Sequence, residues 1–319
     1  MNAPAAPPLV SVVMPAFNAE RYIAAAMDSV LAQTWDKLEL FVVDDGSTDG
    51  TAHVARQIAA RDGRVRYHWQ ENRNQGAARN AGLGRAAGEL VAFMDADDLW
   101  LPDKLRAQIG VLETQRADVV FTDADLFADE PGVPLPAGMF GRDTGRLEGT
   151  AMFGRCVRRN AIPLFSVLVR KTWLDRVGGF VEDPAVKGVE DWELWLRLAR
   201  AGAVFYGMPE RLVRYRCHPA QTSRRVAPMR DATLRVLEEY LPHARLAPAE
   251  ADGVRRDVRG WALRTFIEAD DFTAARQELR ALDALGGPPR RRLVDALKYR
   301  VKLFARQRLG LKIHNVFKR

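Results

Sequence analysis

Three carboxylates lie within four residues at the end of a predicted strand, at Asp95, Asp97 and Asp98. One residue separates Asp95 from Asp97, and alternate residues of an extended chain point to the same side. Mg²⁺ and Mn²⁺ favour one or two carboxylates together with phosphate oxygens of a substrate. The spacing therefore suits a divalent cation held between protein and diphosphate. A surface turn with solvated acids is the alternative, and we expect Asp98 to act chiefly as a helix N-cap.

Two other polar segments are candidates for ligand binding. Asp45 follows an apolar run in VVDDGSTDGT, where it can accept hydrogen bonds from a nucleoside base or ribose. Capping of the next helix by Ser47 or Asp49 is the alternative, and the two interpretations are compatible. Arg79, in NQGAARNAG, is expected to open a helix where an anionic ligand would sit. The alternative there is a well-packed helix start with a solvated arginine.

A fourth segment, GVEDWELW, places Glu190 and Asp191 beside two tryptophans. An acid against an aromatic wall can have its pKa raised towards the working range of a general base. Acids are also common in the first turn of a helix, where they complement the helix dipole. The segment alone leaves both interpretations open.

The elements that must position these side chains follow from the hydrophobic pattern. Strands read as continuous apolar runs and alternate with amphipathic helices, which predicts an α/β fold with a mostly parallel, Rossmann-like sheet and helices on both faces. In such sheets the ligand lies off the carboxyl ends of the strands, where the polar stretches fall. The predicted strands span residues 9–17, 38–45, 65–69 and 89–98, and the helices span 19–34, 51–61 and 74–86.

The second half of the chain is less regular. Proline and glycine are frequent between residues 121 and 160, which predicts a surface excursion. Order returns with a strand, a short helix and a Gly-Gly turn over 162–180, then an amphipathic helix over 189–202. Residues 203–219 are expected to form a pair of strands ending near His218. Beyond about residue 227 the chain is expected to be helical.

Composition restricts the class of protein. The net charge is +7, but residues 290–319 hold eleven Lys or Arg and one acid, a net +10, so the remainder carries −3. The basic character thus belongs to the C-terminus, and no nucleic-acid partner is expected. Two cysteines form no disulfide pattern, which favours a reducing compartment. No apolar run approaches the ~20 residues that span a bilayer. A cytoplasmic protein is expected, with any membrane contact at the surface only.

Six motifs in order resemble the family-2 inverting glycosyltransferases with the GT-A fold, of the bacterial cell-surface polysaccharide type. The resemblance covers about residues 9–220. It implies a catalytic domain over 9–225. The composition of residues 1–8 predicts a disordered leader, and residues 226–319, which lie outside the resemblance, are expected to form a helical basic region. The motifs are SVVMPAFNAE, VVDDGSTDGT, NQGAARNAG, FMDADD, VGGF and EDWELWLRL.

The resemblance implies a role for each matching residue. For the donor it implies nucleotide contacts by Pro15 and Asn18, recognition of the base by Asp45, a donor-pocket arginine at Arg79, and Asp95 near ribose and metal. Asp97 matches the principal metal-binding carboxylate. Asp191 matches the catalytic base, with Glu190 beside it. His218 lies in a segment that can fold over the diphosphate, where it would bind metal or phosphate; a solvated loop histidine is the alternative. Phe17 departs from the family, which often has tyrosine there.

The expected reaction follows from these roles. A Mn²⁺ or Mg²⁺ ion stabilises the departing nucleoside diphosphate, while a base takes the proton of an acceptor hydroxyl and the anomeric centre inverts in one displacement. The donor is expected to be a UDP-linked sugar and the acceptor a saccharide or a lipid-linked saccharide. A nucleotidyltransferase and a non-catalytic nucleotide-sugar-binding module are the alternatives. The N-terminal segment lacks the glycine-rich basic phosphate loop that the former usually has, and a binding module needs neither Asp97 nor Asp191.

The C-terminal segment 290–319 is expected to be a basic amphipathic helix. Leu293, Leu297, Val301 and Phe304 recur at helical spacing, with Lys and Arg on the flanks. Such a helix can lie in an anionic membrane interface on the inner face of the cytoplasmic membrane. Packing of the apolar stripe on the catalytic domain is the alternative.

Overall fold

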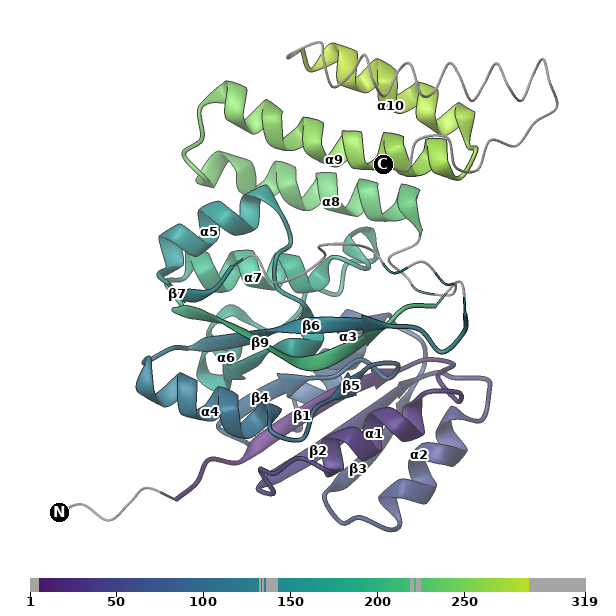
Figure 1. The fold of residues 1–319 in the computed structure, drawn as a ribbon, viewed down its shortest axis with the longest axis vertical. Coiled ribbons are helices and arrows are strands. Elements are labelled where there is room, and N and C mark those ends of the chain that lie inside the picture. Colours follow the sequence, from purple (N-terminus) through teal and green to yellow (C-terminus); the bar gives the residue numbers. More distant parts are fainter. Residues whose placement is uncertain are drawn as a thin grey trace. The chain divides into compact units, whose positions relative to one another are not determined.

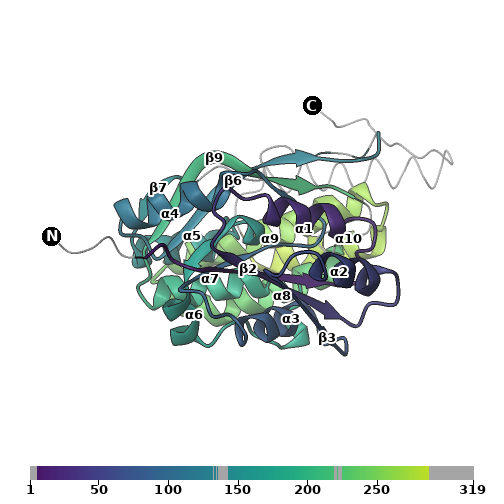
Figure 2. The ribbon, with the colours of Figure 1, turned by 90° about the horizontal axis from the view of Figure 1, so that it is seen from below.

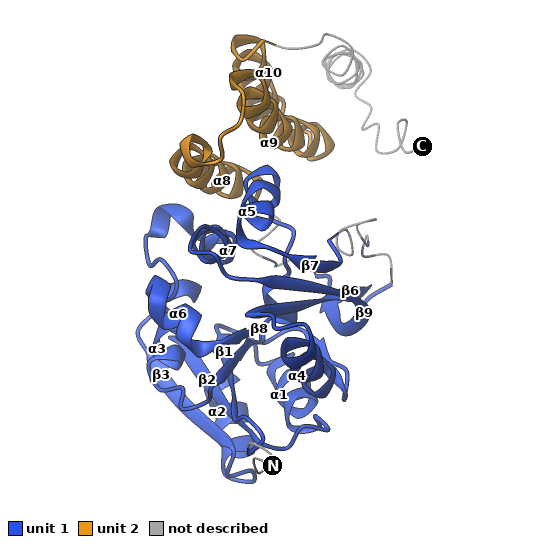
Figure 3. Cartoon of the chain, turned by 90° about the vertical axis from the view of Figure 1, so that its left-hand side faces the viewer, with its two compact units in different colours: residues 1–221 blue, residues 222–319 orange. Residues whose placement is uncertain are grey.

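A computed structural model describes residues 6–131, 133, 135, 143–218, 221 and 225–286. The chain divides into two compact units, residues 1–221 and 222–319 (Figure 3). The segment 290–319, predicted to be a basic helix, lies outside the described residues. So do residues 1–5 of the predicted leader, but the carbonyl of Pro8 accepts a hydrogen bond from the Trp35 indole at 3.2 Å.

The first unit is built on a mixed sheet of nine strands within the described residues, in the order β3-β2-β1-β4-β8-β6-β9-β5, with β7 paired to β9. Strands β1 to β4 pair in parallel, as predicted, and β6 pairs in parallel with β9 (Figure 1, Figure 2). The strands are β1 Val10–Ala16, β2 Leu38–Asp45, β3 Val65–Gln70, β4 Leu90–Phe93, β5 Leu99–Trp100, β6 Val119–Phe127, β7 Gly145–Leu147, β8 Leu168–Arg170 and β9 Phe205–Arg216.

Helices cover both faces of this sheet, as predicted (Figure 3). On one face, alternate residues of β1, such as Val12 and Met14, join Ile23, Met27 and others in a core with helices α1, α2 and α4. On the other, α3 lies so close to β1 that a Cβ on Gly82 would meet Val13 at 2.5 Å. The helices of this unit are α1 Ile23–Leu31, α2 Thr51–Ala59, α3 Gln75–Leu83, α4 Lys104–Thr114, α5 Gly149–Arg158, α6 Lys171–Val177 and α7 Glu190–Arg200.

Two predictions for the later part of this unit are wrong. Residues 203–219 were expected to form two strands, but β9 is a single long strand beside β6 (Figure 1). Its register against β6 shifts between Met208 and Arg211, so Pro209 lies in a bulge where no ladder hydrogen bond is required of it. The expected excursion over 121–160 begins only after β6, and it includes β7 and α5.

The second unit is helical in its described part, as expected. A buried cluster that includes Leu263, Phe266, Ile267 and Leu282 joins α9 and α10. The buried carboxylate of Glu278 forms ion pairs with Arg230 of α8 and Arg259 of α9. Its helices are α8 Val226–Tyr240, α9 Pro248–Glu268 and α10 Phe272–Ala284. No helix in the described part of the chain is long and apolar enough to cross a membrane.

Candidate active site

The carboxyl ends of β1 and β2 form the first part of the candidate site. Asn18 follows β1 with φ +49°, and its backbone N–H donates to Ser47 Oγ at 3.0 Å. Its side-chain oxygen accepts the Thr48 N–H at 2.8 Å. These bonds join the loop after β1 to the loop after β2. Pro15 is buried within β1, whereas Phe17 is 52% exposed.

Asp45 ends β2 with its carboxylate oriented by two donors. Oδ1 accepts hydrogen bonds from Gln70 Nε2 at 2.7 Å and from the Arg73 N–H at 2.9 Å. The N-cap of α2 is Gly50, which has no side chain to cap with, and Asp49 just before it accepts the N–H of the first helical residue, Thr51, at 3.0 Å. Asp45 therefore does not cap α2. Its side chain is held at the end of β2, where a nucleoside is expected to bind.

Arg79 was predicted to lie at the start of a helix, but it lies in the middle of α3. Asn74 is the N-cap, and its side chain accepts the Ala77 N–H at 3.2 Å. The Arg79 guanidinium is 3% exposed and forms two ion pairs, with Asp95 at 2.9 Å and with Glu190 at 2.7 Å. Burial lowers the pKa of Arg79, but the two carboxylates more than offset it, so the pKa is raised. Arg79 is therefore a buried cation shared by two acids from distant segments.

The three aspartates after β4 have different partners because the chain turns at Ala96 and Asp97 instead of staying extended. Asp95 binds Arg79, and Asp97 Oδ2 lies 2.9 Å from His218 Nε2. Burial, followed by the attraction of Arg79 and the repulsion of Asp97, leaves the pKa of Asp95 raised. Arg79 is thus a positive group beside Asp95, as this acidic segment requires.

Asp98 is not a helix N-cap, contrary to expectation. Helix α4 begins at Lys104 with Asp103 before it. Asp98 is fully buried, and its Oδ1 accepts the Arg216 N–H at 2.9 Å. Its Oδ2 is buried without a hydrogen-bond partner among the described residues. Burial, then the charges of Asp97 and Asp95, raise the pKa of Asp98 well above its usual value. Asp98 therefore attaches the segment from Asp95 to Asp98, called here the acidic turn, to β9.

The acid pair predicted to contain the base begins α7, and its two members differ in environment. Glu190 is 4% exposed; Oε1 binds Arg79, and Oε2 accepts the Gly188 N–H at 2.6 Å. Asp191 is partly buried, and its Oδ1 accepts the Trp192 N–H at 2.6 Å. Burial, then the charge of Glu190, raise the pKa of Asp191 to about 7, against the opposing effect of Arg79. Asp191 is therefore the acid of the pair that can exchange a proton near neutral pH.

Asn160 also contacts Asp191, and nothing in the sequence pattern predicts this. Its side-chain N–H group lies 3.3 Å from both carboxylate oxygens. Asn160 follows α5, which is attached to α7 by the hydrogen bond from Trp192 Nε1 to the Cys156 carbonyl at 2.7 Å. A donor placed here favours the ionised form of Asp191. Arg216 is a second residue that the motifs did not single out, although it lies two positions before His218.

The described residues contain no cluster of three or more His, Cys, Asp or Glu side chains that could hold a metal ion. Asp97 and His218 nevertheless provide a carboxylate oxygen and an imidazole nitrogen in direct contact. This pair fits a cation whose remaining ligands are water and substrate phosphate, as is usual for Mg²⁺ and Mn²⁺ bound to nucleotides.

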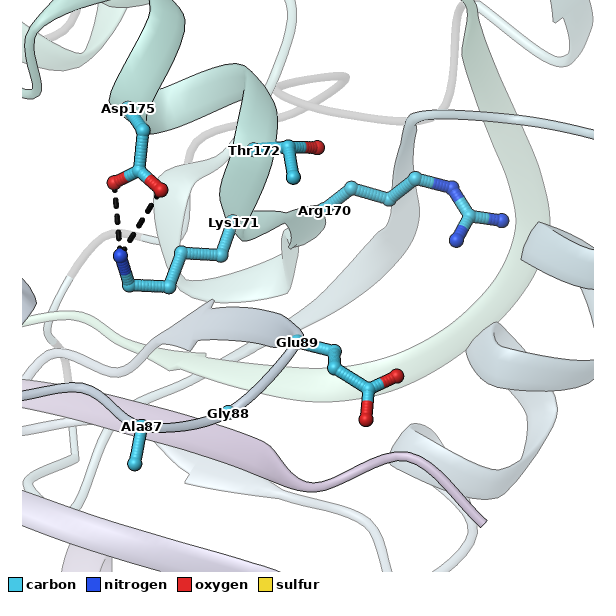
Figure 4. Close-up of a pocket in the computed structure, with 7 residues that line it drawn as sticks. All are labelled: Ala87, Gly88, Glu89, Arg170, Lys171, Thr172 and Asp175. Carbon is cyan, nitrogen blue, oxygen red and sulfur yellow. Dashed lines mark hydrogen bonds and ion pairs between the residues drawn. The ribbon is translucent and has the colours of Figure 1, made fainter. Parts of the chain in front are cut away.

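A pocket at the opposite edge of the sheet contains none of the predicted site residues (Figure 4). It lies before β4, at Ala87 to Glu89, and beside the start of α6. Lys171 there pairs with Asp175 at 2.8 Å. The chemistry-bearing residues are instead at the carboxyl ends of the parallel strands, where ligands of such sheets bind.

This architecture is that of GT-A glycosyltransferases. TarS of S. aureus, solved in complex with UDP-GlcNAc, has a TM-score of 0.65 at 18% identity, over 96% of this chain and 93% of that chain. The mannosyltransferase PcManGT of Pyrobaculum calidifontis, solved with GDP-Man and Mn²⁺, has a TM-score of 0.62 at 21% identity, over 96% of this chain and 84% of that chain. At these identities the likeness establishes the fold.

Sequence comparison gives the family. Residues 11–159 match the model described as Glycosyl transferase family 2. TuaG of Bacillus subtilis, named as a teichuronic acid biosynthesis glycosyltransferase, is 33% identical over 210 residues, 66% of this chain and 79% of that protein. The glycosyltransferase EpsE of the same organism is 31% identical over 220 residues, 66% and 73% of the two chains. The chain belongs to glycosyltransferase family 2, as its motifs predicted.

Proposed function

We propose that this glycosyltransferase transfers a sugar from a UDP-linked donor to a hydroxyl of a saccharide or lipid-linked acceptor, with inversion, in cell-surface polysaccharide synthesis. The observation that carries the proposal is the pair of sites at one edge of the sheet. Asp97 and His218 can hold a cation, and Asp191 has a pKa of about 7. Arg79 connects the two sites through Asp95 and Glu190. The names of TuaG and of the UDP-GlcNAc complex of TarS support the choice of pathway and nucleotide.

In this proposal the donor lies along the ends of β1, β2 and β4. Asp45 accepts hydrogen bonds from the base, and the segment from Pro15 to Asn18 lines the nucleotide, as the resemblance implies. Asp95 lies near the ribose. Asp97 and His218 hold Mn²⁺ or Mg²⁺, which when bound stabilises the negative charge of the departing diphosphate. Because Arg79 is engaged by two carboxylates, we assign it to holding Asp95 in place.

Asp191 acts on the acceptor in this proposal. Its ionised carboxylate takes the proton from the acceptor hydroxyl as that oxygen attacks the anomeric carbon from the face opposite the leaving group. Glu190 keeps its charge paired with Arg79, so we assign it to positioning, not to proton transfer. One displacement at the anomeric carbon inverts its configuration.

The experiment is a screen of UDP-, GDP- and dTDP-sugars with Mn²⁺, Mg²⁺ or EDTA, followed by release of nucleoside diphosphate. We expect metal-dependent release from one UDP-sugar, and NMR of the product should show the inverted anomer. Release of pyrophosphate would indicate a nucleotidyltransferase instead. Nucleotide-sugar binding without turnover on any acceptor would indicate a binding module.

Replacement of Asp97 by Asn tests the metal assignment. We expect the loss of the anionic ligand to abolish most turnover and to weaken Mn²⁺-dependent donor binding. Calorimetric titration of UDP with and without Mn²⁺ measures the second effect. Near-wild-type turnover of Asp97→Asn with Mn²⁺ would remove Asp97 from the metal site.

We also propose that residues 290–319 bind the inner face of the cytoplasmic membrane. This part rests on the sequence alone, where eleven basic residues accompany one acid. A surface location would bring the enzyme to a lipid-linked acceptor.

A further inference from the structure

Arg216, the last residue of β9, is a second buried cation in contact with the acidic turn. It is 6% exposed, and its Nε donates to the carbonyl of Asp97 at 2.6 Å. Its Nη1 pairs with Asp129, and its backbone N–H donates to Asp98 Oδ1. One residue thus contacts the main chain of the proposed metal ligand and the side chain of its neighbour.

Aromatic rings fix the guanidinium in this position. Its carbon lies 4.8 Å from the centroid of the Tyr22 ring and 4.5 Å from that of Phe127. A planar guanidinium can stack on rings while its edge donates hydrogen bonds, which an ammonium cannot reproduce. Tyr22 also contacts the His218 ring, at 5.2 Å between centroids. The same ring therefore contacts Arg216 and the second proposed metal ligand.

The end of β9 consequently contacts the acidic turn at three points. Asp98 Oδ1 receives the Arg216 N–H, the Asp97 carbonyl receives Arg216 Nε, and the Asp97 carboxylate meets His218. Gln221 closes the loop after β9, since its Nε2 donates to the Arg216 carbonyl at 2.6 Å and its Oε1 accepts the His218 N–H at 3.2 Å. The positions of Asp97 and His218 thus depend on the same strand end.

We propose that Arg216 is a positioning residue that holds Asp97 and His218 in the arrangement that binds the divalent cation. This inference rests on the proposed function, because it assumes the cation site. Arg216 contacts neither cation nor reacting atoms; it acts through the Asp97 carbonyl and through the ring that it shares with His218. Outer residues of this kind commonly change metal affinity by about 10–100-fold.

The test measures Mn²⁺ binding to the full chain by electron paramagnetic resonance, alone and with UDP. We compare wild type with Arg216→Gln and Arg216→Lys. Arg214→Gln is the matched control, because the Arg214 side chain also lies on the Phe127 ring, at 4.3 Å, but is exposed and is two residues away on the same strand. UDP affinity in EDTA and the melting temperature are measured for each variant.

We expect Arg216→Gln to weaken Mn²⁺ binding by about 10-fold or more. Arg216→Lys should fall between this variant and wild type, and Arg214→Gln should match wild type. UDP affinity in EDTA should be unchanged, because four strands separate β9 from β2, which carries the proposed base-binding Asp45. A changed Mn²⁺ spectrum in Arg216→Lys at an unchanged melting temperature would separate positioning from a general loss of structure.

Three outcomes overturn the inference while leaving the proposed cation site in place. The first is wild-type Mn²⁺ affinity in both Arg216 variants. The second is equal weakening in Arg214→Gln, which would assign the effect to the ring contact. The third is an Arg216→Lys variant whose Mn²⁺ affinity falls only as far as its UDP affinity in EDTA and its melting temperature fall. That result would indicate a general loss of structure. If wild type itself binds no Mn²⁺ with or without UDP, the metal part of the proposed function fails, and the positioning role fails with it.

Discussion

At the scale of single residues, the decisive contrast is between two neighbouring acids. The two oxygens of Glu190 bind Arg79 and the Gly188 N–H. Asp191 instead accepts hydrogen bonds from two uncharged donors, the Asn160 amide and the Trp192 N–H. Asp191 also experiences the charge of Glu190, which contributes to its raised pKa. A proton-accepting group with a pKa near the working pH combines a useful ionised fraction with useful basicity.

The pH dependence of kcat/KM should show this acid. Asp191 must be ionised to accept a proton, so activity should fall as the pH drops through about 7 and level off above it. Asp191→Asn should remove this limb and lower turnover by about 10²–10⁴-fold while nucleotide binding persists. A flat profile down to pH 5 in the wild type would contradict the assignment, and a parallel loss of donor affinity in Asp191→Asn would indicate a structural role.

Asn160→Ala should shift that acidic limb to higher pH. The variant loses an N–H donor that favours the ionised form of Asp191, so the pKa of the base should rise. The midpoint of the kcat/KM profile measures the shift. Asn72→Ala is the control, because it also removes an amide, but one that donates to the backbone carbonyl of Asp45 at the end of β2 and not to Asp191. Equal midpoints in wild type and Asn160→Ala would exclude the effect.

At the scale of elements, the ion pairs of Arg79 join α3, α7 and the turn after β4. Removing one partner of a buried pair leaves the other charge without compensation, which typically costs about 3–5 kcal/mol. We expect Arg79→Met to lower the free energy of unfolding by this amount. Arg21→Met is the control; its pair with Glu130 is exposed on both sides, so this variant should unfold close to wild type.

Urea unfolding followed by tryptophan fluorescence measures this difference. Of the seven tryptophans, only Trp261 lies in the second unit, so the signal reports mainly on the sheet domain. Similar midpoints for Arg79→Met and Arg21→Met would show that the Arg79 pairs contribute no more than surface pairs do.

Elements set by local pattern could be predicted from the sequence. The parallel strands β1 to β4 are continuous apolar runs, and their ends carry Asn18, Asp45 and Asp95. The single strand β9 could not be predicted, because Pro209 resembles a turn residue until a partner strand accommodates it in a bulge. The Arg79–Glu190 pair joins residues 111 positions apart, so no local spacing indicates it.

At the scale of the whole molecule, the charge is divided between the sheet unit and the C-terminal segment. A chain ending at Pro289 lacks the net +10 of residues 290–319. Near an anionic membrane each Lys or Arg contributes about 1 kcal/mol. We therefore expect the full chain, but not the shortened one, to sediment with phosphatidylglycerol vesicles at low salt. Equal behaviour of the two forms would remove the segment as an anchor.

The sharing of Arg79 also has a thermodynamic consequence. One cation balances Asp95, on the proposed donor side, and Glu190, on the proposed acceptor side. A ligand that draws Asp95 away from Arg79 would therefore change the electrostatic potential at Asp191. Binding equilibria linked in this way are reciprocal. If donor binding changes the proton affinity of Asp191, then protonation of Asp191 must change donor affinity by the same factor. The enzyme would thereby take up or release a fraction of a proton when the nucleotide sugar binds, before any acceptor arrives.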